Sequence, residues 1–92
     1  MSILVRFAPT SMTTEQYEQV RSGLQEAGHF PPDGMEVHVC FGPEGNLRVS
    51  EVWASRERFD QFAEQQLMRR IGEAGIEGGE PEFLDVHNLV VP

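Results

Sequence analysis

The sequence predicts an α+β fold in which four strands form one antiparallel sheet and two helices cover one of its faces. Four segments alternate apolar and polar residues as strands do, and two segments repeat apolar residues every three or four positions as helices do. Their order along the chain is strand, helix, strand, strand, helix, strand. Because the strands carry apolar residues on both faces, we expect the uncovered face to pack against a second copy, which predicts a homodimer.

Length and charge narrow the classes of function. The 92 residues support one domain over 1–92, small enough that association would add useful buried apolar surface. A net charge of −8, from 15 acidic and 7 basic residues, disfavours nucleic acid and anionic membranes as partners. All 7 basic residues are arginine, which excludes a Schiff-base lysine and a P-loop lysine. The single cysteine and the lack of a signal-like or membrane-length apolar segment predict a cytoplasmic protein.

The first strand is expected over residues 2–8, where apolar and polar residues alternate until Pro9. Thr13 follows as a helix cap, with Gln16 at the capping-box position, and the helix is expected to end near Ala27. Gly28 suits the left-handed conformation beyond that end. The inward stripe of this helix consists of Tyr17, Val20, Leu24 and Ala27.

A hairpin is predicted from the strands 35–41 and 47–53, joined by the turn 42–45. The sequence leaves its register open. A three-residue loop with Gly45 as a bulge sets His38 opposite Ser50, whereas a four-residue loop sets His38 opposite Glu51. The Pro-Glu-Gly series in the turn favours the first. Under the second, the adjacent carboxylate would fix the imidazole tautomer and raise its basicity.

The second helix is expected to begin after Ser55, its cap, and to end near Gly75. The glycine-rich, acidic stretch 75–81 is interpreted as an exposed connector, and residues 83–91 as the last strand. The buried stripe of the helix consists of Phe59, Phe62, Ala63, Leu67 and Ile71. Two strand-helix-strand halves in this order predict a ferredoxin-like sheet with both helices on the same side.

The element order, the size and the segment Glu51-Val52-Trp53-Ala54-Ser55, which leads into a helix carrying Phe59 and Phe62, support a family resemblance. The chain resembles the dimeric α/β-barrel superfamily, with the antibiotic-biosynthesis-monooxygenase-like branch nearest. The resemblance implies that two sheets pack face to face into a barrel and that each protomer keeps a cavity near its sheet. It also implies a flat, aromatic or polyketide-like ligand.

The chain departs from one group within that superfamily. Haem-degrading members rely on an asparagine in the first strand and a histidine on the second helix, and this sequence has neither. Cofactor-free quinone-forming monooxygenases need only a polar group that stabilises a substrate anion in an apolar pocket, and the chain meets that demand. No cofactor is expected, since no phosphate loop or flavin motif is present.

Several polar residues on the strands are candidates for a site. His38 lies on one strand face with Cys40, Arg6 lies on the less apolar face of the first strand, and His87 shares a face of the last strand with Asp85. We expect these strand residues to converge, with His38, His87 and Arg6 as catalytic groups. The predicted pocket residues are Trp53, Glu51, Phe62 and Tyr17.

A different interpretation of the same residues remains open. A histidine in a half-buried strand of a small dimer is more often a hydrogen-bonded structural group than a catalyst. Arg6 would then form a salt bridge across the dimer, and the protein would be a non-catalytic module for small-molecule binding or protein interaction. No metal site is expected, because no histidines or cysteines have ligand spacing.

Overall fold

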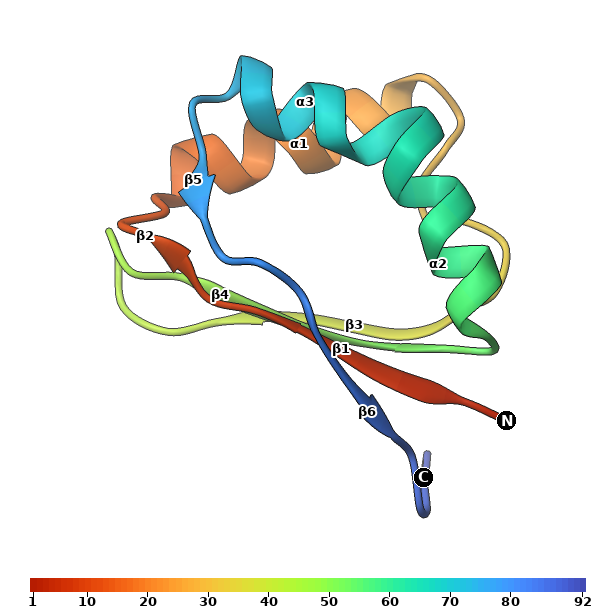
Figure 1. Ribbon diagram of the computed structural model, residues 1–92. Helices are drawn as coiled ribbons and strands as arrows, with labels where there is room; N and C mark the ends of the chain where they lie inside the picture. The colour runs from red at the N-terminus through yellow and green to blue at the C-terminus, as the bar shows by residue number, and fades with distance from the viewer.

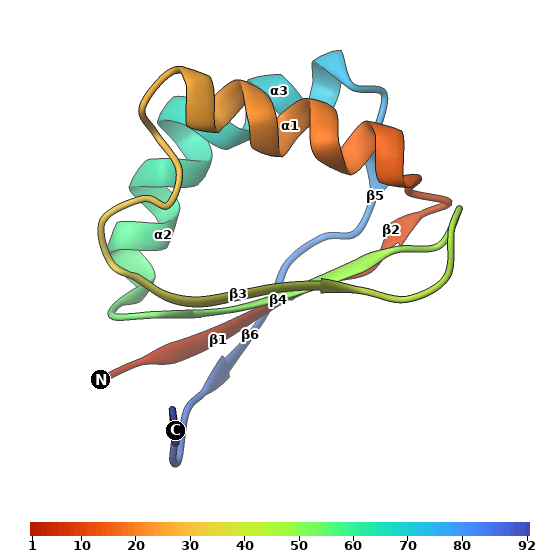
Figure 2. The ribbon, with the colours of Figure 1, turned by 180° about the vertical axis from the view of Figure 1, so that it is seen from behind.

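A four-stranded sheet with a single helical layer makes up most of the protein, as the computed structural model of residues 1–92 shows (Figure 1). The four main strands are β1 (Ile3–Phe7), β3 (Met35–Phe41), β4 (Arg48–Trp53) and β6 (Glu82–Asp85), and their spatial order is β3-β4-β1-β6. All neighbouring pairs are antiparallel. Seen from either side, all helices lie over the same face of this sheet (Figure 2). The predicted ferredoxin-like α+β fold is therefore confirmed.

Helix α1 (Thr14–Glu26) forms where its capping signals predict it. The Thr13 side chain accepts from the Gln16 backbone N, and the Gln16 side chain bonds back to the Thr13 backbone, so the capping box is complete. Gly28 follows the helix with φ +81°, a conformation that a side chain would strain. Met12, just ahead of the cap, is buried and fixes the entry of the helix against the sheet.

The second helix consists of three consecutive pieces: α2 (Arg56–Phe62), η1 (Ala63–Leu67) and α3 (Met68–Glu73). The middle piece is a π-helical turn, which the apolar spacing did not predict because Leu67 still falls on the buried side. Ser55 caps the first turn, as expected, by accepting from the Arg58 backbone N at 3.3 Å. In Figure 1 the run bends at this turn, so that α2 and α3 cover different parts of the sheet.

The hairpin has the four-residue register, so the preference for a three-residue loop was wrong. His38 lies opposite Glu51, and Phe41 lies opposite Arg48. The cause is the turn itself: the Asn46 backbone N donates to the Pro43 carbonyl at 2.9 Å, which keeps Asn46 inside the loop. An irregularity between Met35 and Val37 shifts the pairing by one residue, so that Met35 lies opposite Trp53.

The last strand is shorter than predicted. β6 ends at Asp85, the partner of Ile3 at the start of β1, and residues 86–92 are not strand, although the Val86 backbone N still donates to the Ser2 carbonyl at 3.1 Å. The predicted connector 75–81 contains a short strand, β5 (Glu77–Gly78), which pairs with β2 (Pro9–Thr10). Neither two-residue strand was predicted, since such short pairs leave no alternation in the sequence.

The core lies between the sheet and the helices, and its most deeply buried side chains are Trp53, Leu24 and Val5. The opposite face of the sheet is uncovered. Val39, Phe41 and Leu84 are 44%, 45% and 44% exposed although they belong to strands. No helix is both long and apolar enough to cross a membrane.

Candidate active site

Four side chains form a continuous hydrogen-bonded chain inside the protein. The Tyr17 hydroxyl lies 2.6 Å from His38 Nε2, and His38 Nδ1 lies 2.7 Å from Glu51 Oε2. The other carboxylate oxygen of Glu51, Oε1, accepts from Trp53 Nε1 at 2.9 Å. We refer to Tyr17, His38, Glu51 and Trp53 as the buried relay.

Secondary structure aligns the relay. His38 and Glu51 are directly opposite on neighbouring strands, so their side chains leave the same face of the sheet. Trp53 follows Glu51 by two positions and therefore points to that face as well. Tyr17 lies on α1, one turn after the cap. Its ring stacks on the His38 imidazole, with 5.9 Å between the two ring centroids.

The hydrogen-bond partners define the roles of the groups in this chain. Trp53 Nε1 donates to one oxygen of Glu51, and a carboxylate at Glu51 accepts from His38 Nδ1 at the other. Burial raises the pKa of Tyr17 to about 12, and the neighbouring Cys40 and Glu18 add to that direction. The phenol therefore keeps its proton at neutral pH, and with the proton of the imidazole on Nδ1 the hydroxyl donates to the lone pair at Nε2.

A cavity of about 730 Å³ opens beside the relay, between the helices and the sheet. Most of its wall is apolar, with Phe7, Leu24 and Phe59 among its residues, and Tyr17, His38 and Glu51 contribute to it. Phe30 also lines the cavity and meets the His38 ring edge-on at 5.2 Å between centroids. The size and lining suit a small organic molecule with a flat apolar body.

The three predicted catalytic residues do not converge. Arg6 lies on the uncovered face of the sheet, where it pairs with Glu82 at 3.1 Å and stays 59% exposed. The reason is alternation: Val5 takes the inner side of β1 and is fully buried. His87 lies beyond β6 and is exposed, because the strand that would have carried it ends at Asp85. Only His38 lies at the cavity.

Three of the four predicted pocket residues lie together at the cavity. Tyr17, Glu51 and Phe62 all line the cavity, whereas Trp53 is 0% exposed and packs behind it against Phe59 and Phe62. Trp53 reaches the site only through its bond to Glu51.

Similarity of this chain to known proteins is found in its structure and not in its sequence. No protein-family model matches the sequence, and no curated protein matches it. SnoaB, a cofactor-independent oxygenase from Streptomyces nogalater, has a TM-score of 0.62 at 14% identity, covering 97% of this chain and 94% of that one. A candidate antibiotic biosynthesis monooxygenase from Chloroflexus aurantiacus reaches 0.66 at 12% identity, covering 100% of both chains. The chain has the antibiotic-biosynthesis-monooxygenase-like fold.

The same fold serves more than one chemistry. A haem-degrading protein from Mycobacterium tuberculosis has a TM-score of 0.59 at 14% identity, covering 99% of this chain and 100% of that one. Identities this low establish the fold alone, so the function within this monooxygenase-like fold has to be argued from the site.

Sequence patterns missed the contact between Tyr17 and His38. Tyr17 was predicted as part of the buried helix stripe and as a pocket residue, but nothing in its spacing links it to a residue on another element. The only signal is that a buried tyrosine hydroxyl needs a partner, and His38 was the polar group on the inner face of β3.

Cys40 lies near Tyr17 but outside the hydrogen-bonded chain. Cys40 packs against the small cluster of Met12, Leu47 and Val49, and burial raises the pKa of its thiol, which favours the unreactive protonated form. No three histidine, cysteine, aspartate or glutamate side chains come together in a group that would hold a metal ion.

Proposed function

We propose that this protein is a cofactor-independent monooxygenase of a small aromatic molecule, with His38 as its general base. One observation carries the proposal: an imidazole on the wall of an apolar cavity is held at Nδ1 by a buried carboxylate. This arrangement fixes the tautomer, leaves the lone pair at Nε2 directed toward Tyr17, and stabilises the imidazolium that forms when that nitrogen takes a proton.

The class of substrate follows from the hydrogen-bonding position at His38 Nε2 and the apolar wall around it. A phenol or an anthrone-like enol would take the position of the Tyr17 hydroxyl at Nε2 and pass its proton to His38. The electron-rich anion would then reduce dioxygen without help. In the overall step a ring methylene becomes a carbonyl: one oxygen atom enters the product, the other leaves as water, and the substrate supplies all four electrons.

The protein is further proposed to act as a homodimer through its uncovered sheet face. Val39, Phe41 and Leu84 supply exposed apolar surface there, and Val52 lies buried among them on the same side. A second copy presenting the same face would cover this surface and place the two sheets face to face. Each cavity would remain on the helical side of its own protomer.

A second candidate function is non-catalytic binding of a similar ligand. The observation that favours it is that the Tyr17 hydroxyl already occupies His38 Nε2, so the relay is satisfied as it stands. In that case His38 would hold Tyr17 in place and the cavity would only bind.

Oxygen uptake with a hydroxyanthrone as the probe separates the two functions. The oxygenase predicts dioxygen consumption and quinone formation by the wild type and a loss of about a hundredfold in His38→Gln. His87→Gln, an exposed histidine outside the cavity, is the matched control and should keep full activity. Binding of the probe without oxygen uptake in the wild type supports the non-catalytic candidate instead.

A further inference from the structure

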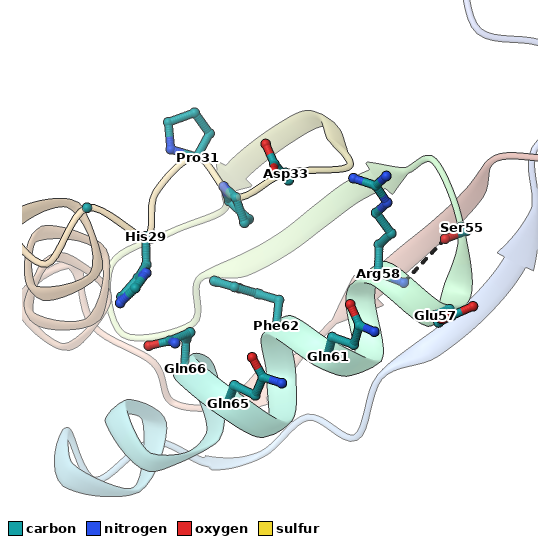
Figure 3. A pocket seen from close by; sticks show the side chains of 12 residues that line it. His29, Pro31, Asp33, Ser55, Glu57, Arg58, Gln61, Phe62, Gln65 and Gln66 are labelled. Atoms are coloured by element: carbon teal, nitrogen blue, oxygen red, sulfur yellow. Dashed lines mark hydrogen bonds between the residues drawn. The ribbon is translucent and has the colours of Figure 1, made fainter.

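A second hollow lies on the other side of Phe62. It has a volume of about 840 Å³ and separates the connector 28–33 from the outer face of α2 and η1 (Figure 3). Apart from Pro31 and Pro32, Phe62 is the one apolar residue of its wall, and it also lines the cavity at His38. We call this hollow the polar cleft. One side is lined by Gly28, His29, Pro31, Pro32 and Asp33, and the other by residues between 55 and 66.

Backbone bonds hold both walls of the polar cleft. The His29 backbone N donates to the Leu24 carbonyl at 2.8 Å, and the Ala54 backbone N donates to the Gly34 carbonyl at 2.7 Å. Arg58 packs along the connector, since a Cβ on Gly34 would lie 2.6 Å from Arg58 Cδ. The cleft is thus formed before any ligand arrives, which lowers the cost of ordering it.

Amide groups dominate the helical wall. Gln61, Gln65 and Gln66 follow one another along α2 and η1, and Figure 3 shows their side chains on the cleft side of the helix. His29 points toward Gln66 from the opposite wall. The only hydrogen bond among the residues drawn is the one that caps α2, so these donors and acceptors are free for a ligand.

The charged side chains that line the polar cleft indicate which kind of ligand it can bind. The lining carries the positive charge of Arg58 and the negative charges of Asp33 and Glu57. Because both signs are present, neither an anion nor a cation is strongly attracted. A flat apolar ligand is disfavoured because polar side chains make up most of the wall. Primary amides both donate and accept, which matches the paired hydroxyls of a polyol, and the proline and imidazole rings offer C–H surface.

From this geometry we propose that the polar cleft is a second ligand site, independent of His38, which binds a neutral polyhydroxylated molecule of the sugar class. The three glutamine amides bind its hydroxyls, and His29 and Pro31 close over one face of its ring.

Amide resonances of labelled protein provide the test, with glucose and maltose as probes and acetate as the charged comparison. We expect the sugars to shift signals of Gln61, Gln65 and the first turn of α2. The double variant Gln61→Leu/Gln65→Leu should weaken binding by about tenfold. Gln19→Leu, at an exposed glutamine of α1, is the matched control and should bind as the wild type does.

Trp53 fluorescence verifies that each variant is folded, since this is the only tryptophan of the chain. The proposal is overturned if neither sugar shifts these signals, if the double variant binds as tightly as the control, or if acetate shifts them more strongly than the sugars. None of these outcomes depends on oxygenase activity.

Discussion

The indole of Trp53 and the carboxylate of Glu51 are joined by a buried hydrogen bond of 2.9 Å between residues two apart on β4. This bond satisfies one oxygen of Glu51 and leaves the other for His38. Both oxygens of the Glu51 side chain, which is 5% exposed, therefore have hydrogen-bond partners, as a buried polar group requires. The core tryptophan therefore contributes to the site without lining the cavity.

Replacing Glu51 by leucine should destabilise the protein by about 2–4 kcal/mol, because the N–H groups of His38 and Trp53 would lose their acceptor inside the core. Urea unfolding followed by Trp53 fluorescence measures this. Glu51→Gln keeps one acceptor oxygen and should fall between the wild type and Glu51→Leu.

Glu73→Leu, at an exposed position of α3, is the control and should stay within about 0.5 kcal/mol of the wild type. If Glu51→Leu proves as stable as this control, the buried relay does not stabilise the fold.

Tyr17 should ionise near pH 12 in the folded protein and near its ordinary value of 10.0 when unfolded. It is the only tyrosine, so the absorbance of tyrosinate reports it alone. A pKa raised in the folded state means that the unfolded chain loses its proton first. The stabilisation is complete below about pH 10 and is lost as the pH rises toward about 12.

The control for this titration is Tyr17→Phe, whose stability should lack that decline between pH 10 and 12. Titration of the folded wild type at the ordinary value would show that the phenol is not buried as the structure places it.

The sequence predicted the elements well because each has a local cause. The cap at Thr13 and the apolar stripe of α1 need only a few neighbouring residues to specify them. The register of the β3–β4 hairpin and the convergence of the predicted site residues depend on groups outside those short segments. The position of His38 opposite Glu51 was set by one backbone bond within the turn, and the outward placement of Arg6 by the burial of Val5 beside it.

Gly79→Ala should destabilise the protein more than Gly28→Ala, although both glycines have positive φ angles, +71° and +81°. A Cβ on Gly79 would lie 2.7 Å from the Pro9 backbone N, whereas one on Gly28 meets nothing within 4 Å. Gly28→Ala should cost about 1 kcal/mol from its backbone conformation alone. Gly79→Ala should cost about 2–4 kcal/mol, because the β2–β5 pair must separate. Equal costs in urea unfolding would contradict this packing.

The uncovered sheet face should govern self-association. Val39→Asp combined with Leu84→Asp places two carboxylates on a surface that a second copy would bury, and unpaired buried charges are costly. We expect the wild type to sediment as a dimer at micromolar concentration and the double variant as a monomer with unchanged circular dichroism. Met68→Asp is the matched control, because Met68 is an equally apolar, 57% exposed residue of the helical layer, and it should remain dimeric. A monomeric wild type, or a double variant that still dimerises, would remove this face as the interface and leave its apolar strand residues without a role.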